Sequence, residues 1–129
     1  NIIIVSNQSG IARGYYTEID YRLLTKWMIA KFENKAIKIL DVLHCPHGPN
    51  EACKCRKPMP GMFLKSQKTY NINMGLSWMV GDKESDIIAS IAAGIENNIL
   101  VRSGHLIDET NSKAMFILDS IKESTSIIT

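Results

Sequence analysis

Cysteine and histidine are concentrated in one short stretch of this 129-residue sequence, and that stretch most constrains how the chain folds. Its order is Cys45-x-His47 followed by Cys53-x-Cys55, with His44 directly before the first pair. Three thiolates and one imidazole form the kind of four-ligand set that zinc takes in closed structural sites. The stretch from residue 45 to residue 61 has no apolar periodicity and holds all four prolines, so we expect a long loop that a zinc ion clamps over residues 44–58.

Two alternatives to a zinc site stay open on the residues alone. The cysteines are free thiols of a reduced protein, with His44 and His47 as ordinary polar surface groups, or they form disulfides. An odd number of cysteines without a secretory signal disfavours disulfides. We favour His47 as the fourth ligand and treat His44 as the spare. Four protein ligands leave no position for water, so the zinc is expected to be structural.

Apolar runs of strand length alternate with helical patterns along the rest of the chain. Strands are predicted over residues 2–5, 37–43, 77–80, 98–101 and 115–118, and the first reads as a buried parallel strand because its β-branched run does not alternate. Helices are predicted from Thr17, which forms a capping-box pattern with Asp20, and over 62–70 and 84–93, with Gly94 as the C-cap. The apolar face of the first helix is expected to comprise Leu23, Leu24, Trp27, Met28 and Phe32. This alternation predicts an α/β fold with a parallel sheet.

Length and composition fit one globular domain over residues 1–129. The chain is 45% hydrophobic and 22% charged, which excludes disorder of the whole chain. Its net charge of +2 is too small to indicate nucleic-acid binding or a membrane-surface patch. No apolar run is long enough to cross a bilayer. The expected protein is cytoplasmic and monomeric, with a small molecule as its partner and neither nucleic acid nor membrane.

Polar side chains follow three of the predicted strands. Ser6-Asn7-Gln8-Ser9-Gly10 offers hydroxyls, amides and backbone N–H groups near a helix start, which suits an oxyanion, although such residues also form ordinary turns. Asp82 ends another strand and suits Mg²⁺, while Asp86 is either its supporting partner or a helix cap. Arg56, Lys57 and Lys83 are the cations placed to recognise a phosphate. In a parallel sheet these loops gather at the carboxyl ends of the strands.

Three blocks carry a resemblance to a known family. They are Val5-Ser6-Asn7-Gln8-Ser9-Gly10-Ile11-Ala12-Arg13-Gly14, the loop from Cys45-Pro46-His47 to Cys53-x-Cys55-Arg56-Lys57-Pro58, and Met79-Val80-Gly81-Asp82-Lys83-x-x-Asp86. In this order they closely resemble the D,D-heptose 1,7-bisphosphate phosphatases of the haloacid dehalogenase-like superfamily. The resemblance implies a Rossmann-like three-layer parallel sheet. It also implies Mg²⁺-dependent removal of the 7-phosphate of D-glycero-D-manno-heptose 1,7-bisphosphate, a step toward ADP-heptose and the lipopolysaccharide core.

The resemblance also implies roles for individual residues. Ser6 takes the place of the hydroxyl residue that hydrogen-bonds the transferring phosphoryl group, and Asn7, Gln8 and Ser9 line the same substrate loop. Arg56 resembles the substrate-recognition arginine and Lys57 the lysine that stabilises the phosphoryl group. Asp82 corresponds to a Mg²⁺ ligand and Lys83 to a substrate contact. The structural zinc ligands correspond to Cys45, His47, Cys53 and Cys55.

One departure from the family pattern is large. Family members begin with a central strand that ends in Asp-x-Asp-Gly-Thr, whose first Asp attacks phosphorus to form an aspartyl-phosphate and whose second is the general acid and base. The 129-residue sequence has no such motif. We therefore expect a phosphatase chain without its N-terminal nucleophile segment, in which strands next to the missing one have unpaired backbone groups.

Two other functions stay open at this point. One is a histidinol-phosphate phosphatase, which shares the zinc loop within the same superfamily. The other is a zinc-stabilised module that binds phosphorylated ligands without hydrolysing them. The coding sequence upstream of Asn1 distinguishes the module from an enzyme, because an in-frame Asp-x-Asp-Gly-Thr strand supports catalysis.

Overall fold

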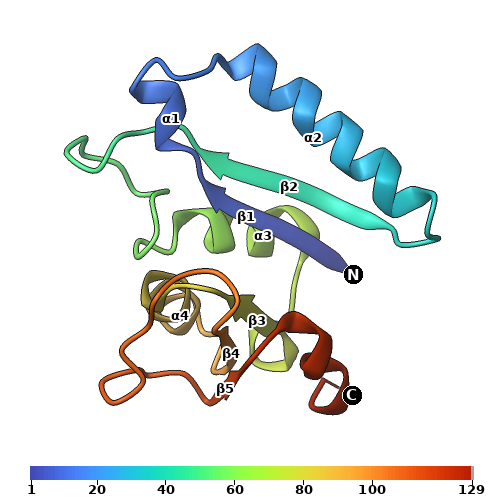
Figure 1. The fold of residues 1–129 in the computed structure, drawn as a ribbon, viewed down its shortest axis with the longest axis vertical. Helices are drawn as coiled ribbons and strands as arrows, with labels where there is room; N and C mark the ends of the chain where they lie inside the picture. Colours follow the sequence, from blue (N-terminus) through green and yellow to red (C-terminus); the bar gives the residue numbers. More distant parts are fainter. Residues whose placement is uncertain (129) are drawn as a thin grey trace. The chain divides into compact units, whose positions relative to one another are not determined.

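The computed structural model describes residues 1–128. They form two compact units, Asn1–Arg56 and the segment from Lys57 onward. Each unit has its own parallel sheet, with β1 and β2 in the first and β3, β4 and β5 in the second (Figure 1). The α/β alternation and the parallel pairing are therefore confirmed, whereas a single domain over residues 1–129 stays a prediction. None of the helices in residues 1–128 is both long enough and apolar enough to cross a membrane.

In the first unit, β1 (Ile2–Asn7) pairs with β2 (Ile39–Cys45), and α2 (Glu18–Glu33) packs along β2 (Figure 1). Asn7 lies opposite Cys45, and the backbone N–H of Gln8 extends the ladder by donating to the Cys45 carbonyl at 2.8 Å. The loop after β1 and the first cysteine therefore lie at the same edge of one sheet. A short helix, α1 (Ser9–Ala12), follows β1 and was not predicted.

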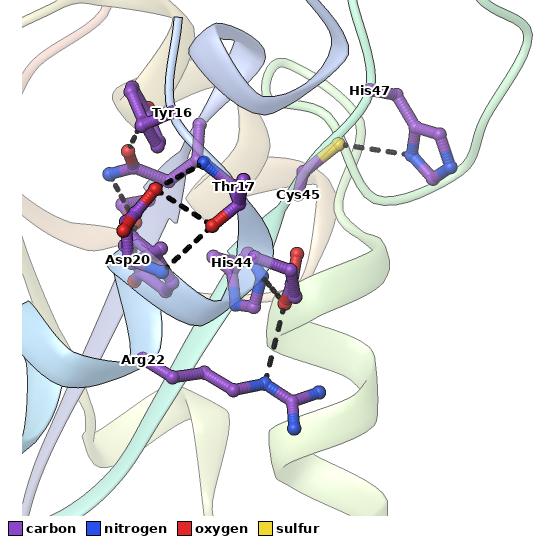
Figure 2. Close-up of polar contacts among 11 residues, drawn as sticks. Tyr16, Thr17, Asp20, Arg22, His44, Cys45 and His47 are labelled. Carbon is purple, nitrogen blue, oxygen red and sulfur yellow. Dashed lines mark hydrogen bonds and ion pairs between the residues drawn. The ribbon is translucent and has the colours of Figure 1, made fainter. Parts of the chain in front are cut away.

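The start of α2 confirms the predicted capping box. The backbone N–H of Asp20 donates to Thr17 Oγ1 at 3.1 Å, and the Thr17 backbone N–H donates to Asp20 Oδ2 at 2.8 Å. Figure 2 shows these reciprocal bonds at the first turn. Because the first N–H groups of a helix have no partner within the helix, this arrangement satisfies two donors at once.

Two expectations about burial in this unit are wrong. The predicted strand over residues 2–5 is half-buried at best and Ile2 is 47% exposed, because among residues 1–128 β1 has only β2 as a strand partner. The predicted apolar face of α2 is also misplaced, since Leu23, Leu24 and Trp27 are exposed. The helix is turned so that Tyr21, its one buried residue, lies on the packed side. Both sides of α2 carry apolar residues, so periodicity alone did not distinguish them.

The second unit begins with α3 (Gly61–Tyr70) and the 3-10 turn η1 (Met74–Leu76). The sheet order is β3 (Trp78–Gly81), β4 (Asn97–Val101) and β5 (Phe116–Leu118), and η2 (Ile121–Ser126) follows. The helix α4 (Glu84–Ala92) packs on β3 and β4, and its Ile87 is fully buried together with Ile99 and Leu100. Most apolar burial in this unit thus lies around β4, which holds the end of β3 and the start of α4 in place.

Candidate active site and metal centre

Four ligand atoms of the cysteine loop converge in the first unit, and they come from Cys45, His47, Cys53 and Cys55. They all lie within 4.8 Å of one another, and the Cys45 and Cys53 sulfurs are 3.8 Å apart. His47 Nδ1 lies 3.4 Å from the Cys45 sulfur and 3.2 Å from that of Cys55. Figure 2 draws the first of these contacts as a dashed line. Zinc–sulfur bonds of about 2.3 Å at tetrahedral angles place two sulfurs about 3.8 Å apart. The Cys45 and Cys53 sulfurs match this distance, whereas those of Cys45 and Cys55 are closer, at 3.1 Å. The donor types, their number and their convergence fit zinc.

The cysteine thiols of this cluster differ in acidity. Burial raises the pKa of Cys45 to about 12, and a hydrogen bond with Cys55 adds to the effect. Burial also opposes ionisation of Cys53, but hydrogen bonds from the backbone N–H groups of Arg56 and Cys55 outweigh it and lower that pKa to about 7. Because metals bind the thiolate, zinc binding at neutral pH has to release the proton of Cys45.

His44, the spare candidate, lies outside this cluster. Its Nε2 is 2.6 Å from Oε1 of Glu18, and its ring packs against Tyr21 with ring centroids 4.2 Å apart. Figure 2 shows His44 beside α2 and His47 beside Cys45. The preference for His47 over His44 agrees with this placement.

The loop after β1 places Ser6 in a chain of side-chain hydrogen bonds. The Tyr16 hydroxyl donates to Gln8 Oε1 at 2.6 Å, and Gln8 Nε2 donates to Ser6 Oγ at 3.2 Å. Ser6 Oγ also lies 3.3 Å from the Tyr21 hydroxyl. Asn7 ends β1 and Ser9 begins α1, so the predicted substrate loop sits where a strand passes into a helix.

Arg56 and Lys57 follow the last cysteine and have different surroundings. Arg56 Nη1 donates to the His47 carbonyl at 3.4 Å, within the cysteine loop. Lys57 Nζ lies 2.7 Å from Asp86 Oδ1, and the two side chains are only 9% and 6% exposed. A buried ammonium group without a partner is strongly unfavourable, so Asp86 is the charge that compensates Lys57 and orients its Nζ.

Asp86 combines the two roles weighed for it from the sequence. Its Oδ2 accepts the backbone N–H groups of Asp82 at 3.2 Å and Lys83 at 3.1 Å, at the start of α4. Its other oxygen, Oδ1, forms the ion pair with Lys57. Because both of its carboxylate oxygens have partners, Asp86 holds the backbone of the loop after β3 in place. Lys83, in the same loop, is exposed to solvent.

Asp82 lies directly after β3 with a half-buried carboxylate. Its Oδ2 is 2.6 Å from Nδ1 of His105, which comes from the loop after β4. A Cβ at Gly104 would overlap the Asp82 carboxylate, so only glycine allows that loop to approach so closely. As a carboxylate at a strand end, Asp82 fits one oxygen ligand of a Mg²⁺ ion, which takes few protein ligands and keeps several waters.

Sequence reasoning missed three residues that contact predicted site residues. His105 follows β4 by a few residues, so the rule that polar residues gather at strand ends was sufficient to find it. Tyr16 and Tyr21 contact Gln8 and Ser6 through their hydroxyl groups. No sequence signal marks them, because a tyrosine in a turn or on a helix is usually a packing residue.

Known proteins resemble this chain in sequence and in fold. A family model described as HAD-hydrolase-like matches residues 54–124. The D-glycero-alpha-D-manno-heptose-1,7-bisphosphate 7-phosphatase of Photorhabdus laumondii is 46% identical over 121 residues, which are 88% of this chain and 66% of the relative. The D-glycero-beta-D-manno-heptose-1,7-bisphosphate 7-phosphatase of Yersinia pestis is 40% identical over 130 residues, 95% of this chain and 69% of the relative. The chain belongs to the heptose bisphosphate phosphatase family.

Solved structures agree with membership in the heptose bisphosphate phosphatase family at the level of the fold. A D,D-heptose 1,7-bisphosphate phosphatase from B. bronchiseptica, complexed with magnesium and phosphate, has a TM-score of 0.81 at 24% identity, covering 100% of this chain and 75% of that one. A HAD-like phosphatase from Mesorhizobium loti has a TM-score of 0.80 at 27% identity, covering 98% and 63%. The fold is thus of the haloacid dehalogenase-like type that the resemblance implied. The chain spans about two thirds of the length of the sequence relatives named above.

Proposed function

We propose that this chain belongs to a phosphatase that removes the 7-phosphate of D-glycero-D-manno-heptose 1,7-bisphosphate, on the route to ADP-heptose and the lipopolysaccharide core. The observation that carries the proposal is 46% and 40% identity to two enzymes named for this reaction. The residues predicted to bind the phosphate support it, because each lies in one of the three sequence blocks that resemble the family. Each of these residues is also at a strand end or in the cysteine loop. We place the enzyme in the cytoplasm as a monomer.

The side chains divide the work of holding the phosphoryl group. Ser6 hydrogen-bonds it, and the neighbouring Asn7, Gln8 and Ser9 line the substrate loop. Lys57 neutralises charge that develops on the phosphoryl oxygens, an effect that is large when the cation is fixed in advance and shielded from water. Its ion pair with Asp86 provides that fixing. Arg56 and Lys83 contact the rest of the substrate.

Magnesium is the proposed catalytic cofactor, and Asp82 is its ligand in this chain. When bound, the ion polarises the phosphoryl group and offsets its negative charge. The attacking carboxylate is an aspartate outside residues 1–129: it forms a bond to phosphorus while the bond to the 7-oxygen breaks, and the second aspartate of the same motif gives that oxygen its proton. The second aspartate then takes a proton from the water that attacks phosphorus, so the aspartyl-phosphate bond breaks, phosphate leaves and the first carboxylate is restored. Asp82 and Asp86 do not replace it, since Asp82 serves the metal and Asp86 has three partners.

Zinc is the proposed structural cofactor, held by Cys45, His47, Cys53 and Cys55. The convergence of these ligand atoms supports the assignment. A closed site of four protein ligands contributes folding free energy and no open coordination position. Its role is to hold the loop that carries Arg56 and leads into Lys57.

The test is phosphate release by the protein encoded in the complete reading frame that contains residues 1–129. We expect Mg²⁺-dependent release of one phosphate from heptose 1,7-bisphosphate, with kcat/KM well above that for histidinol phosphate, and ³¹P NMR should show that the 7-phosphate is lost. Both anomers serve as substrates in the assay. A preference for histidinol phosphate would make the protein the other phosphatase of the superfamily, and tight binding of both esters without hydrolysis would make it a binding module.

A further inference from the structure

A series of side-chain hydrogen bonds runs from Tyr16 through Gln8 to the hydroxyl of Ser6. The links are Tyr16 to Gln8 at 2.6 Å and Gln8 to Ser6 at 3.2 Å, all inside the first unit and all partly buried. Figure 2 shows Tyr16 in the turn before α2, with its hydroxyl directed at a neighbouring amide. Tyr16 thus reaches Ser6 only through the amide of Gln8.

The direction of these hydrogen bonds follows from the chemistry of each group. In the structure the Tyr16 hydroxyl donates to Gln8 Oε1, which can only accept, so the oxygen end of the amide faces Tyr16. The amide nitrogen then faces Ser6 and donates to its Oγ. Because Gln8 occupies one lone pair of this hydroxyl, the proton of Ser6 is turned away from Gln8, toward Tyr21 or toward an anion in the loop.

The opposite orientation of the amide would change what Ser6 can do. With Oε1 next to Ser6, the amide would accept the proton of the hydroxyl, and Ser6 would have no proton to donate to an anionic oxygen. The two orientations of a glutamine amide have nearly the same shape, so packing alone does not choose between them. In the structure the Tyr16 hydroxyl bonds Oε1 and so holds the amide with Nε2 toward Ser6.

The position of Tyr16 is itself built into the loop. A Cβ at Gly10 would overlap the Tyr16 ring, so the ring lies directly on the backbone of α1. Tyr15, the neighbouring residue, is 74% exposed, so its ring is not packed in this way. The contrast indicates that the Tyr16 ring is held in place and that its hydroxyl is aimed.

We propose that Tyr16 is a positioning residue: its hydroxyl locks the Gln8 amide so that the Ser6 hydroxyl stays ready to donate to a phosphoryl oxygen. This inference rests on the proposed function, in which Ser6 contacts the phosphoryl group. Tyr16 does not touch the substrate. Its effect passes entirely through Gln8 and Ser6.

The first test is spectroscopic and uses the product of the complete reading frame that contains residues 1–129. Tyr16→Phe keeps the ring on Gly10 and removes only the hydroxyl, and Tyr15→Phe removes an exposed hydroxyl as the matched control. We expect the side-chain amide resonances of Gln8 in ¹H–¹⁵N spectra to shift in Tyr16→Phe and to stay unchanged in Tyr15→Phe. Unchanged Gln8 resonances in Tyr16→Phe would show that no lock exists.

The second test is kinetic and uses the product of the complete reading frame. Tyr16→Phe should lower kcat by about threefold to tenfold, the usual weight of one neutral hydrogen bond, with little change in KM. In a Ser6→Ala background the same change should have no further effect, because residues that act through one another are not additive. An equal loss in both backgrounds would overturn the proposal.

These outcomes separate the inference from the function on which it rests. If Ser6→Ala lowers kcat and Tyr16→Phe does not, the positioning role fails and the phosphatase stands. If Ser6→Ala has no effect, Ser6 is not in the phosphoryl site and the positioning role fails, whereas the phosphatase activity that was measured stands. In a protein without phosphatase activity the proposed function fails, and the Gln8 resonances still decide whether the lock exists.

Discussion

The ammonium group of Lys57 and the carboxylate of Asp86 are withdrawn from water together, 2.7 Å apart. Sequence reasoning identified Lys57 as a phosphate-binding candidate and left Asp86 between two roles, because a motif gives residue types and order but no distances between loops. Folding of the second unit supplies the pairing. A buried cation that is already compensated needs little reorganisation when a phosphoryl group arrives, which is the property that transition-state stabilisation requires.

Replacing Lys57 therefore tests the site at the scale of one residue. We expect Lys57→Ala in the product of the complete reading frame to lower kcat by more than about tenfold, because a fixed charge contact to the transition state is lost. The substitution also leaves Asp86 buried without its cation, which is expected to destabilise the fold by about 3 kcal/mol. To measure the loss of kcat separately from the loss of stability, phosphate release is assayed at a temperature at which circular dichroism shows that the variant is folded.

The matched control for Lys57 is Lys54→Ala, three residues earlier in the same loop and exposed. It should leave both kcat and stability nearly unchanged, since single surface substitutions have small effects. If Lys57→Ala matches this control in turnover, Lys57 has no part in the reaction.

At the scale of elements, the cysteine loop was the most predictable part of the chain. Ligand types and pair spacing identified Cys45, His47, Cys53 and Cys55, and the structure brings their ligand atoms within 4.8 Å. Helix starts and ends were also readable to within a residue: Thr17 caps α2 as predicted, whereas α4 ends at Ala92 with Ala93 as its C-cap, and Gly94 follows with a φ of 88°. The packed side of α2 was not, because it depends on which neighbour the helix meets, and Tyr21 rather than Leu24 faces the packed side.

Zinc removal tests the loop as an element. We expect about one zinc per chain by elemental analysis, and loss of the ordered loop when a chelator removes it, because no helix or strand lies within residues 46–56. Zinc affinity should fall as pH falls, because the Cys45 thiol, whose pKa is raised to about 12 in the metal-free chain, competes for protons. Cys53→Ser should weaken zinc binding, and Ser9→Ala is a control outside the ligand set. Metal-free protein with an unchanged spectrum would remove the clamp from the account.

The capping box of α2 predicts a pH dependence. Hydrogen bonds from the Thr17 backbone N–H and hydroxyl lower the pKa of Asp20, so its ionised form is favoured in the folded protein. Stability from this group is present above its unfolded pKa of about 4 and is lost as pH falls through the lower folded value. Urea unfolding should therefore show that Asp20→Asn destabilises the protein at pH 7 and has a smaller effect below about pH 3. A constant difference at both pH values would mean that the charge of Asp20 has no role.

At the scale of the whole molecule, strand pairing is the feature that bears most on whether a family strand is missing from these residues. Among residues 1–128, β1 pairs only with β2 and β3 only with β4, all in parallel. These pairings fit the expectation of a family sheet whose central strand, with the Asp-x-Asp-Gly-Thr motif, is not among these residues. The exposure of Leu23, Leu24 and Trp27 lay outside the reach of sequence patterns, because burial depends on everything that packs against a surface.

The most direct test compares phosphate release from heptose 1,7-bisphosphate by two proteins, the product of the complete reading frame and residues 1–129 alone, each with zinc and Mg²⁺. The account predicts turnover by the first and none by the second, because it assigns phosphoryl binding to residues 1–129 and the attack on phosphorus to the Asp-x-Asp-Gly-Thr motif, which they lack. Substituting the first Asp of an Asp-x-Asp motif by Asn in the first protein should abolish turnover. Turnover by residues 1–129 alone, or none by either protein, would contradict the account.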